Sequence, residues 1–186
     1  GNSAAAHHCV HAGAVYLHQG GSWLVTGLEL ERGLALVEPT GDEITTHARE
    51  VTDIRVLGEG AHRNWGRVRL VCGTVEVTSQ VVSFVRRSVR DGQVLGEEPL
   101  DLPTRTLRTS AVWWTMPEDL LAEHGVELAA VPGAAHAAEH AAIGLLPLVA
   151  TCDRWDVGGI STALHPDTGL PTIFVHDGHP GGAGFA

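Results

Sequence analysis

The chain has 186 residues, is 44% hydrophobic and carries a formal net charge of −10 at pH 7. This length suffices for one domain with a proper core or for two small domains, and the composition is that of a globular protein. The negative charge argues against nonspecific nucleic-acid binding by the chain as a whole, because such binding depends on basic side chains that neutralise phosphates.

No apolar run approaches the roughly 20 residues that a membrane span requires, and the N-terminus lacks a signal-peptide pattern. The three cysteines, Cys9, Cys72 and Cys152, lie far apart and form no CxxC pair. Such a sparse, odd set predicts free, buried thiols in a reducing compartment. We therefore expect a cytoplasmic protein without a membrane partner.

The segment from Gly13 to about Met116 has the pattern of β structure, and we expect residues 1–12 to be a disordered or tag-derived tail. Tyr16–His18 and Trp23–Thr26 flank Gln19-Gly-Gly-Ser22, which predicts a β-hairpin. Further strands are predicted by loosely alternating runs, and a turn by Asp91-Gly92; the runs lie at 34–37, 44–57, 67–71, 74–78 and 81–89. Short strands with frequent turns predict a small antiparallel β barrel or sandwich over residues 13–116.

Helical signals begin at Pro117, where Pro117-Glu-Asp119 suits the first turn of a helix that Gly125 would end. An Ala-rich helix is predicted from Gly133 to about Leu146, and a buried strand at Pro171–His176. Residues 117–186 therefore form a mixed helix-and-strand module. The predicted fold class is α+β, with the β-rich module first.

All twelve basic residues are arginines, and nine of them lie between Arg55 and Arg108 together with only six acidic residues. Arginine suits bidentate contacts to phosphate. If the chain touches nucleic acid, the predicted contacts are Arg67, Arg69, Arg86, Arg87 and Arg90. Trp113-Trp114 places one ring on each face of a strand, and we expect Trp113 to stack on an unpaired base or to pack on a neighbouring domain.

His136-Ala-Ala-Glu139-His140 is the pattern of inverted zincins, in which two histidines on one helix face bind a metal. A third ligand is not evident, although acidic and histidine side chains downstream are available: Asp153, Asp156, Asp177 and His179. We expect these seven residues to form a structural polar cluster, with no metal bound and no catalytic residue. A metal-dependent hydrolase remains the alternative.

The stretch Asp177-Gly-His-Pro-Gly-Gly-Ala-Gly184 matches neither the Walker A pattern nor GxGxxG, and the chain has no lysine to hold a phosphate. The backbone N–H groups of Gly181 and Gly182 are candidates to cradle a nucleic-acid phosphate. A tight structural turn is the simpler interpretation.

Several segments, taken in order, resemble the C-terminal region of bacterial superfamily 2 DNA helicases of the mitomycin repair factor A type. They are Gly13–Gly21, Leu100–Thr104, Arg108–Trp113, His136–His140, Cys152–Gly159 and Phe174–Phe185. In that family the region carries a domain named for zinc binding. The cysteine cluster that holds the zinc lies beyond the glycine-rich turn, so we expect a chain that stops before it.

The resemblance implies a parent that is an ATP-dependent 3′-to-5′ DNA helicase acting in DNA repair, with ATP, Mg and a zinc held by cysteines beyond Ala186. It implies single-stranded DNA and the motor domains of the same parent as partners, and an accessory role in guiding or clamping the strand. The chain has neither GxxxxGK[ST] nor a DExH box, so we expect no enzyme activity and no cofactor in it alone. A docking module that binds protein and never touches DNA is a further alternative.

Overall fold

The computed structural model describes residues 3–186, with side chains from Ala6 onward. Two compact units divide the chain: unit 1 contains Gly1–Val51 and Ser79–Arg105, and unit 2 contains Thr52–Thr78 and Thr106–Ala186. Strands β4 (Ile44–Trp65) and β5 (Val68–Ser88) contribute residues to both units. The single division at Met116 expected from the sequence does not coincide with these units, because each long strand continues without a break from one unit into the other.

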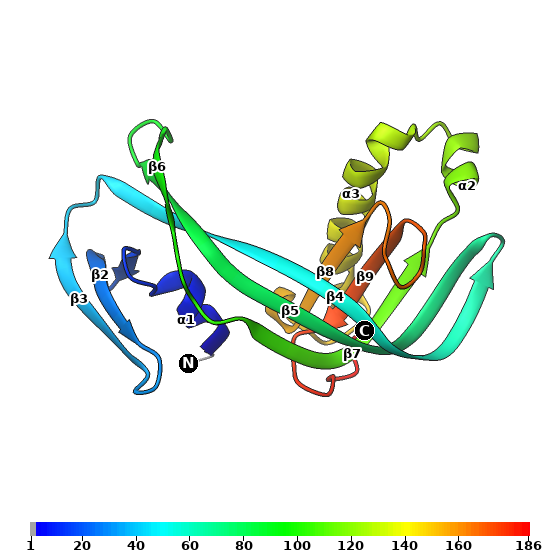
Figure 1. Ribbon diagram of the computed structural model, residues 1–186, viewed down its shortest axis with the longest axis horizontal. Helices are drawn as coiled ribbons and strands as arrows, with labels where there is room; N and C mark the ends of the chain where they lie inside the picture. The colour runs from blue at the N-terminus through cyan, green and yellow to red at the C-terminus, as the bar shows by residue number, and fades with distance from the viewer. Residues whose placement is uncertain (1–2) are drawn as a thin grey trace. The chain divides into compact units, whose positions relative to one another are not determined.

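Unit 1 contains an antiparallel sheet of β1 (Val15–His18), β2 (Gly21–Glu29) and β3 (Leu34–Thr40), shown in blue in Figure 1. The predicted hairpin is confirmed: Gln19 and Gly20 both have positive φ, 49° and 79°, as the turn between paired strands requires. Strand β6 (Val94–Pro99) follows the predicted turn at Gly92 and pairs with the end of β5.

Helix α1 (Ser3–Cys9) occupies the segment where the sequence predicts a disordered or tag-derived tail. The side chain of His7 in this helix is buried, and so is that of His11, which follows the helix. The ring centroids of His11 and Phe84 lie 4.7 Å apart. Aromatic packing of this kind orders a segment that has no hydrophobic periodicity of its own. The tail assignment therefore differs from the structure over residues 3–12, while residues 1–2 lie outside the described part.

The larger sheet, to which both units contribute residues, runs in the order β4-β5-β7-β9-β8, with β7 at Arg105–Thr115, β8 at Val157–Thr162 and β9 at Thr172–Asp177. Alternate residues of β7 are buried, as the two-residue period of a strand predicts. Every residue of β9 is buried, because β7 and β8 flank it and side chains cover both of its faces. On one face these strands enclose a core that includes Ile54, Val71, Val75, Trp113 and Phe174.

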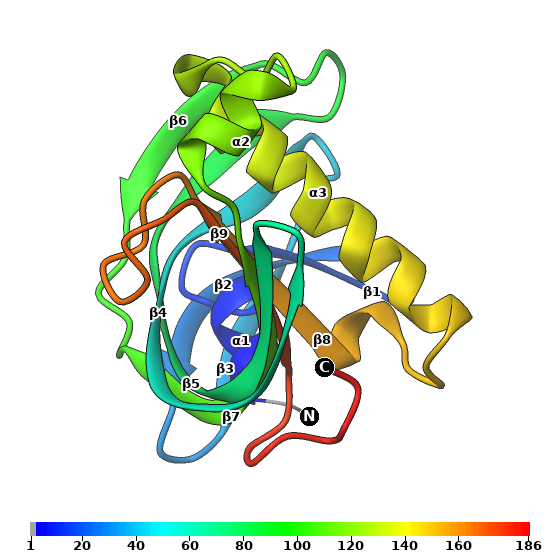
Figure 2. The ribbon, with the colours of Figure 1, turned by 90° about the vertical axis from the view of Figure 1, so that its right-hand side faces the viewer.

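Helix α3 (Val131–Leu145) covers the other face, lying across β8 and β9 (Figure 2). A second core lies there, where Ile143 packs with Val157 and Val175. Helix α2 (Glu118–Glu123) begins after Pro117, and Gly125 follows it with a φ of 78°, as predicted. Short 3₁₀ turns complete the unit at Leu128–Ala130, Leu146–Leu148 and Arg154–Asp156.

The predicted α+β class is confirmed, with mostly antiparallel strand pairing and a few helices. Several predicted strands merge, since 44–57 extends to Trp65 and the three runs between 67 and 89 form one strand, β5. Within residues 3–186, no helix is both long and apolar enough to cross a membrane.

Candidate functional site

His136, Glu139 and His140 come together on the face of α3 that borders β8. The two imidazole Nε2 atoms lie 3.1 Å apart, and Nδ1 of His136 lies 3.4 Å from Oε2 of Glu139. Both rings are exposed, whereas Glu139 is buried. The three residues can each direct one ligand atom into a region less than 4.8 Å across. Helical spacing of four residues produces this convergence, as the sequence predicts.

Glu139 is held in place by Ser161 of β8, whose hydroxyl donates to Oε2 of the carboxylate at 2.6 Å. The close approach of α3 to β8 depends on Gly159, where an added Cβ would lie 2.7 Å from both Glu139 Cγ and Ile143 Cδ1. At Gly158 an added Cβ would lie 2.6 Å from the ring of His176. The Gly158-Gly159 pair therefore makes room for these side chains.

The remaining members of the predicted polar cluster lie in other places. Asp153 and Asp156 form a reciprocal capping box around the 3₁₀ turn Arg154–Asp156. Asp156 also accepts a hydrogen bond from Nε2 of His179 at 3.1 Å. The pKa of Asp156 is held below its ordinary value by the backbone N–H of Asp153 and by His179. These carboxylates act in loop structure, and the group around His136 includes none of them.

Asp177 is fully buried and holds the glycine-rich loop that follows it. Its Oδ2 accepts the backbone N–H groups of Ala183 and Gly184, and its Oδ1 accepts that of Ala186 at 2.9 Å. The N–H of Gly181 donates to the carbonyl of Arg108, and the N–H of Gly182 donates to that of His179. The amides considered as phosphate donors are therefore engaged inside the protein, and the loop is a structural turn around a buried carboxylate.

The five arginines predicted to touch nucleic acid divide between the two units. Arg67 and Arg69 lie in unit 2, whereas Arg86, Arg87 and Arg90 lie in unit 1. Arg67 pairs with Asp119 and Glu123 at 3.1 and 3.0 Å, and Arg69 pairs with Glu59 at 2.7 Å. In unit 1, Arg86 pairs with Glu98 at 2.9 Å. Exposed ion pairs of this kind contribute roughly 0–1 kcal/mol, so a phosphate can compete for them.

Trp113 is 0% exposed and lies in the core of unit 2, with its ring centroid 5.7 Å from that of Phe174. The prediction that Trp113 stacks on a base or packs on a neighbouring domain is therefore wrong. Its neighbour Trp114 packs against the second core. The two rings point to opposite faces of β7, and a core covers each face, so neither ring is fully exposed.

A residue that the sequence analysis did not single out presents an exposed indole. Trp65 is 68% exposed at the end of β4, where Gly66, with a φ of 59°, reverses the chain toward β5. The guanidinium of Arg63 lies 5.3 Å from the ring centroid of Trp65, a cation–π contact. Arg67 and Arg69 follow in the same hairpin. A tryptophan beside a turn glycine, flanked by three arginines, is the sequence signal that identifies this tip.

The three cysteines are free, and Cys9 and Cys72 are exposed rather than buried as the sequence predicts. Burial and three nearby aspartates raise the pKa of the Cys152 thiol above its ordinary value. A raised thiol pKa disfavours the thiolate that binds metals. Among residues 3–186, the only group of three metal-ligating side chains is the one on α3.

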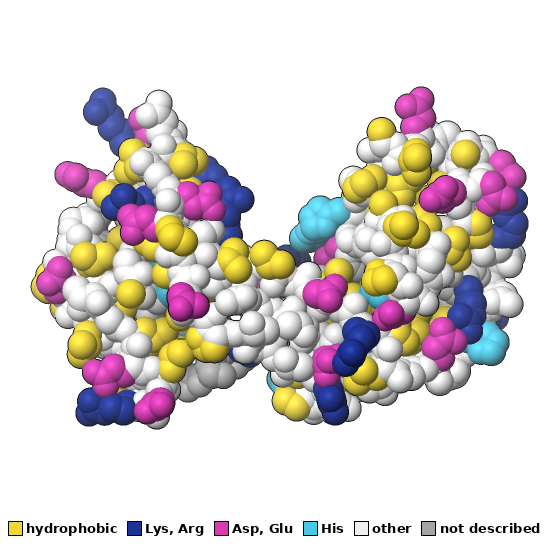
Figure 3. Space-filling model, in the orientation of Figure 1, with side chains coloured by type: hydrophobic (Ala, Val, Ile, Leu, Met, Phe, Trp, Pro, Cys, Tyr) yellow, Lys and Arg dark blue, Asp and Glu magenta, His cyan; other side chains and the backbone are white. Residues whose placement is uncertain are grey.

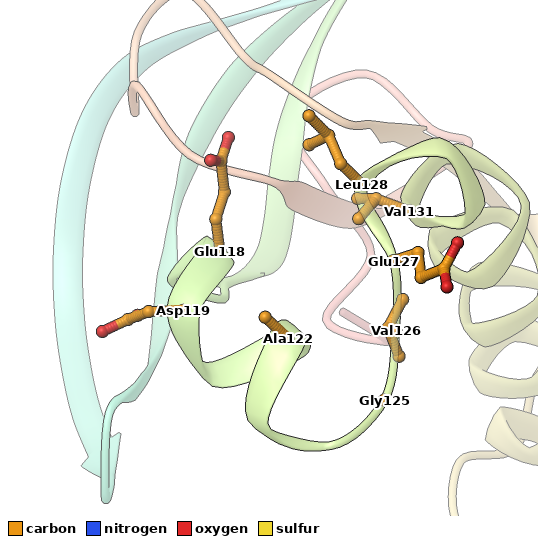
Figure 4. A pocket seen from close by; sticks show the side chains of 8 residues that line it. All are labelled: Glu118, Asp119, Ala122, Gly125, Val126, Glu127, Leu128 and Val131. Carbon is orange, nitrogen blue, oxygen red and sulfur yellow. The ribbon is translucent and has the colours of Figure 1, made fainter.

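A hollow of about 510 Å³ lies between α2 and the start of α3 (Figure 4). Ala122, Val126, Leu128 and Val131 give it apolar walls, and its other lining residues are Glu118, Asp119, Gly125 and Glu127. No histidine lines it, and it does not include the group on α3. The ionisable side chains among its lining residues are the carboxylates of Glu118, Asp119 and Glu127.

Known proteins match this chain along nearly its whole length. Residues 138–186 match the family model of the MrfA Zn-binding domain. The chain is 32% identical over 180 residues to the uncharacterized ATP-dependent helicase YprA of Bacillus subtilis (strain 168). This match covers 95% of the chain and 23% of YprA. The chain thus spans about a quarter of the length of this relative.

Crystal structures of the DUF1998 helicase MrfA share the fold. The DNA-bound structure matches with a TM-score of 0.72 and 28% identity, over 99% of this chain and 24% of MrfA. The structure with DNA and AMPPNP matches with a TM-score of 0.64 and 27% identity, over 100% of this chain and 22% of MrfA. The chain is therefore a homologue of the C-terminal region of MrfA-type helicases, which confirms the resemblance that its sequence predicts.

Proposed function

We propose that this chain is an accessory domain of an ATP-dependent DNA helicase and that it contacts single-stranded DNA through the tip of the β4–β5 hairpin. The observation that carries the proposal is the exposed indole of Trp65 with Arg63 against its face. An exposed indole stacks on any unpaired base, and nearby arginines attract the backbone. The similarity to MrfA, two of whose crystal structures contain DNA, supports this assignment.

In this role the domain guides or clamps a strand that the motor domains of the parent translocate in 3′-to-5′ direction during DNA repair. Nucleotide hydrolysis belongs to the rest of such a protein, because this chain has no Walker A sequence and no lysine to contact a phosphate. A zinc held by cysteines is likewise a property of the parent. The chain acts by positioning DNA, with no chemical step of its own.

The hairpin is suited to weak, reversible binding. The carboxylates of Glu59, Asp119 and Glu123 neutralise Arg67 and Arg69, so DNA must displace these exposed ion pairs. The net charge of −10 adds long-range repulsion. Affinity should therefore be low, and it should fall with added salt, since the favourable part is the release of counterions from DNA.

The test is a titration of labelled oligo(dT) with the chain at two salt concentrations, followed by fluorescence anisotropy. Trp65→Ala should weaken binding roughly 5- to 150-fold, because one stacked base contributes roughly 1–3 kcal/mol. The matched control is Trp155→Ala, which removes another exposed indole, 88% exposed, from a different part of unit 2. Arg67→Ala combined with Arg69→Ala should make the slope of log affinity against log salt concentration shallower by about one to two, because each arginine accounts for about one phosphate contact.

Equal loss of affinity in the Trp65 and Trp155 variants would contradict a specific stacking role for the hairpin. Tight binding that is indifferent to salt and to the arginine substitutions would contradict an electrostatic contact. No binding at any salt would instead favour the second function below.

A docking function is the second candidate, and a specific observation favours it. After α3, the side chains of Leu148 and Val149 are 78% and 86% exposed, and Leu145 is also exposed. Exposed aliphatic side chains that form a contiguous patch are a feature of protein-binding surfaces. The occupant we propose is the remainder of a longer chain of the kind that the homologues represent, of which this chain spans about a quarter.

A further inference from the structure

The two exposed histidines of α3 lie close together on unit 2, and the proposed DNA contact does not involve them. The starting observation is the 3.1 Å between Nε2 of His136 and Nε2 of His140. Two arrangements allow the nitrogens to lie this close. Either one nitrogen carries a proton and donates it to the other, or both lone pairs bind one cation. Figure 3 shows exposed histidine side chains (cyan) on the unit that contains α3.

The separation of the two nitrogens fits two ligands of one metal ion. With metal–nitrogen bonds of about 2.0–2.1 Å, adjacent ligands lie about 2.9 Å apart in square-planar geometry and about 3.4 Å apart in tetrahedral geometry. The observed distance falls between these values. Because the two rings project from one turn of the same helix, a metal can be bound without rearrangement of the backbone.

Glu139 lies behind the pair rather than in it. Its buried carboxylate is fixed by the Ser161 hydroxyl and faces Nδ1 of His136 at 3.4 Å, the long end of hydrogen-bonding distance. A proton held on Nδ1 leaves the lone pair of Nε2 free and directed toward His140. Carboxylates that orient metal-binding histidines in this way are typical of protein metal centres.

We propose that His136 and His140 bind one Zn²⁺ through their Nε2 atoms, that Glu139 positions His136, and that water completes the coordination. Imidazole ligands suit zinc, copper and nickel. Within the described residues no further histidine, cysteine or carboxylate joins the group, so the site is open and the ion exchanges. The site contains no cysteine and is therefore separate from the zinc that the family resemblance implies for the parent. The proposal departs from the expectation, drawn from the sequence, that this cluster binds no metal.

The experiment is a Zn²⁺ titration of the chelator-treated, reduced chain, read by NMR of the ¹⁵N-labelled histidine side chains. The rings of His136 and His140 should shift together and saturate at one ion per chain. His136→Ala and His140→Ala should each weaken binding at least about tenfold, because the second ring acts as an intramolecular ligand. His124→Ala is the matched control, since His124 is an exposed histidine at the end of α2.

Glu139→Gln tests the positioning role and should weaken zinc binding about 10- to 100-fold. If that variant does not fold, Ser161→Ala gives a second test, because it releases the carboxylate without removing it. Ring signals that do not respond to zinc would overturn the proposal, and so would an affinity that His136→Ala leaves unchanged. Since no DNA is present, this outcome is independent of the proposed DNA contact.

Discussion

The carboxylate of Glu139 and the hydroxyl of Ser161, 2.6 Å apart, join helix α3 to strand β8 by a partly buried hydrogen bond. Twenty-two residues of sequence separate the two partners. The bond satisfies a carboxylate that would otherwise be costly to bury beside Gly159. It is also the link between the metal-binding face of α3 and the sheet.

Removal of the carboxylate should therefore destabilise unit 2. Glu139→Ala leaves the Ser161 hydroxyl without its acceptor and opens a small cavity, and we expect a loss of roughly 1–3 kcal/mol in the free energy of unfolding. Urea denaturation measures this change. Glu127→Ala, which removes an exposed carboxylate near the start of α3, should change stability by less than about 0.5 kcal/mol. Similar losses in both variants would show that Glu139 has no special structural role.

Alanine at Gly159 should be destabilising, because the new methyl group would lie 2.7 Å from Glu139 Cγ and from Ile143 Cδ1. Overpacking of this kind costs roughly 1–3 kcal/mol. The control is Gly144→Ala within α3, where an added Cβ meets nothing within 4 Å. Alanine there should be neutral or stabilising by up to about 1 kcal/mol, since it favours the helix. Thermal unfolding of the two variants tests this account. A Gly159→Ala variant as stable as the unsubstituted chain would contradict it.

Asp177→Asn should loosen the glycine-rich loop. The carboxylate accepts three backbone N–H groups, and an amide cannot accept all three without presenting its own donors to one of them. Hydrogen bonds to a charged group contribute roughly 1.5–3 kcal/mol, so we expect a loss of that order. Faster amide exchange at Ala183, Gly184 and Ala186 would show that the loop is affected. Asp101→Asn, at an exposed position, should leave these amides unchanged.

Elements with local signals could be predicted from the sequence. The turn residues Gln19-Gly20 predicted the first hairpin, and Pro117 and Gly125 predicted both ends of α2. Helical spacing predicted that His136, Glu139 and His140 share a face. In each case the information lies within a few residues of the chain, where backbone preference and periodicity act.

Features that depend on tertiary packing could not be predicted in this way. The sequence did not predict strand β8, because Gly158 and Gly159 weaken any strand pattern. Glycine is needed at these two positions because a Cβ would collide with His176 and Glu139. Alternation placed Trp113 and Trp114 on opposite faces, but it could not show that a core covers each face. Similarly, acidic and histidine residues that are near in sequence separated into a capping box, a loop anchor and a helix face.

Burial lowers the pKa of His176 below its ordinary value of 6.5, and the neighbouring backbone carbonyl, Asp177 and Glu139 offset this only in part. The folded protein therefore holds this imidazole neutral, whereas the unfolded chain takes up a proton near pH 6.5. Its contribution to stability is complete above that pH and is lost as pH falls below 6.5 toward the lowered folded pKa.

The chain should consequently lose stability on acidification, with a slope of up to about 1.4 kcal/mol per pH unit from this residue. His7 and His11 add to the slope with the same sign, because burial lowers the pKa of both. His176→Gln removes one titrating group and should reduce the slope, whatever its effect on stability at pH 7.5. Urea midpoints measured from pH 7.5 to 5 provide the test, with the exposed His124→Gln as the control. A slope that His176→Gln leaves unchanged would show that His176 is already protonated in the folded state at mildly acidic pH.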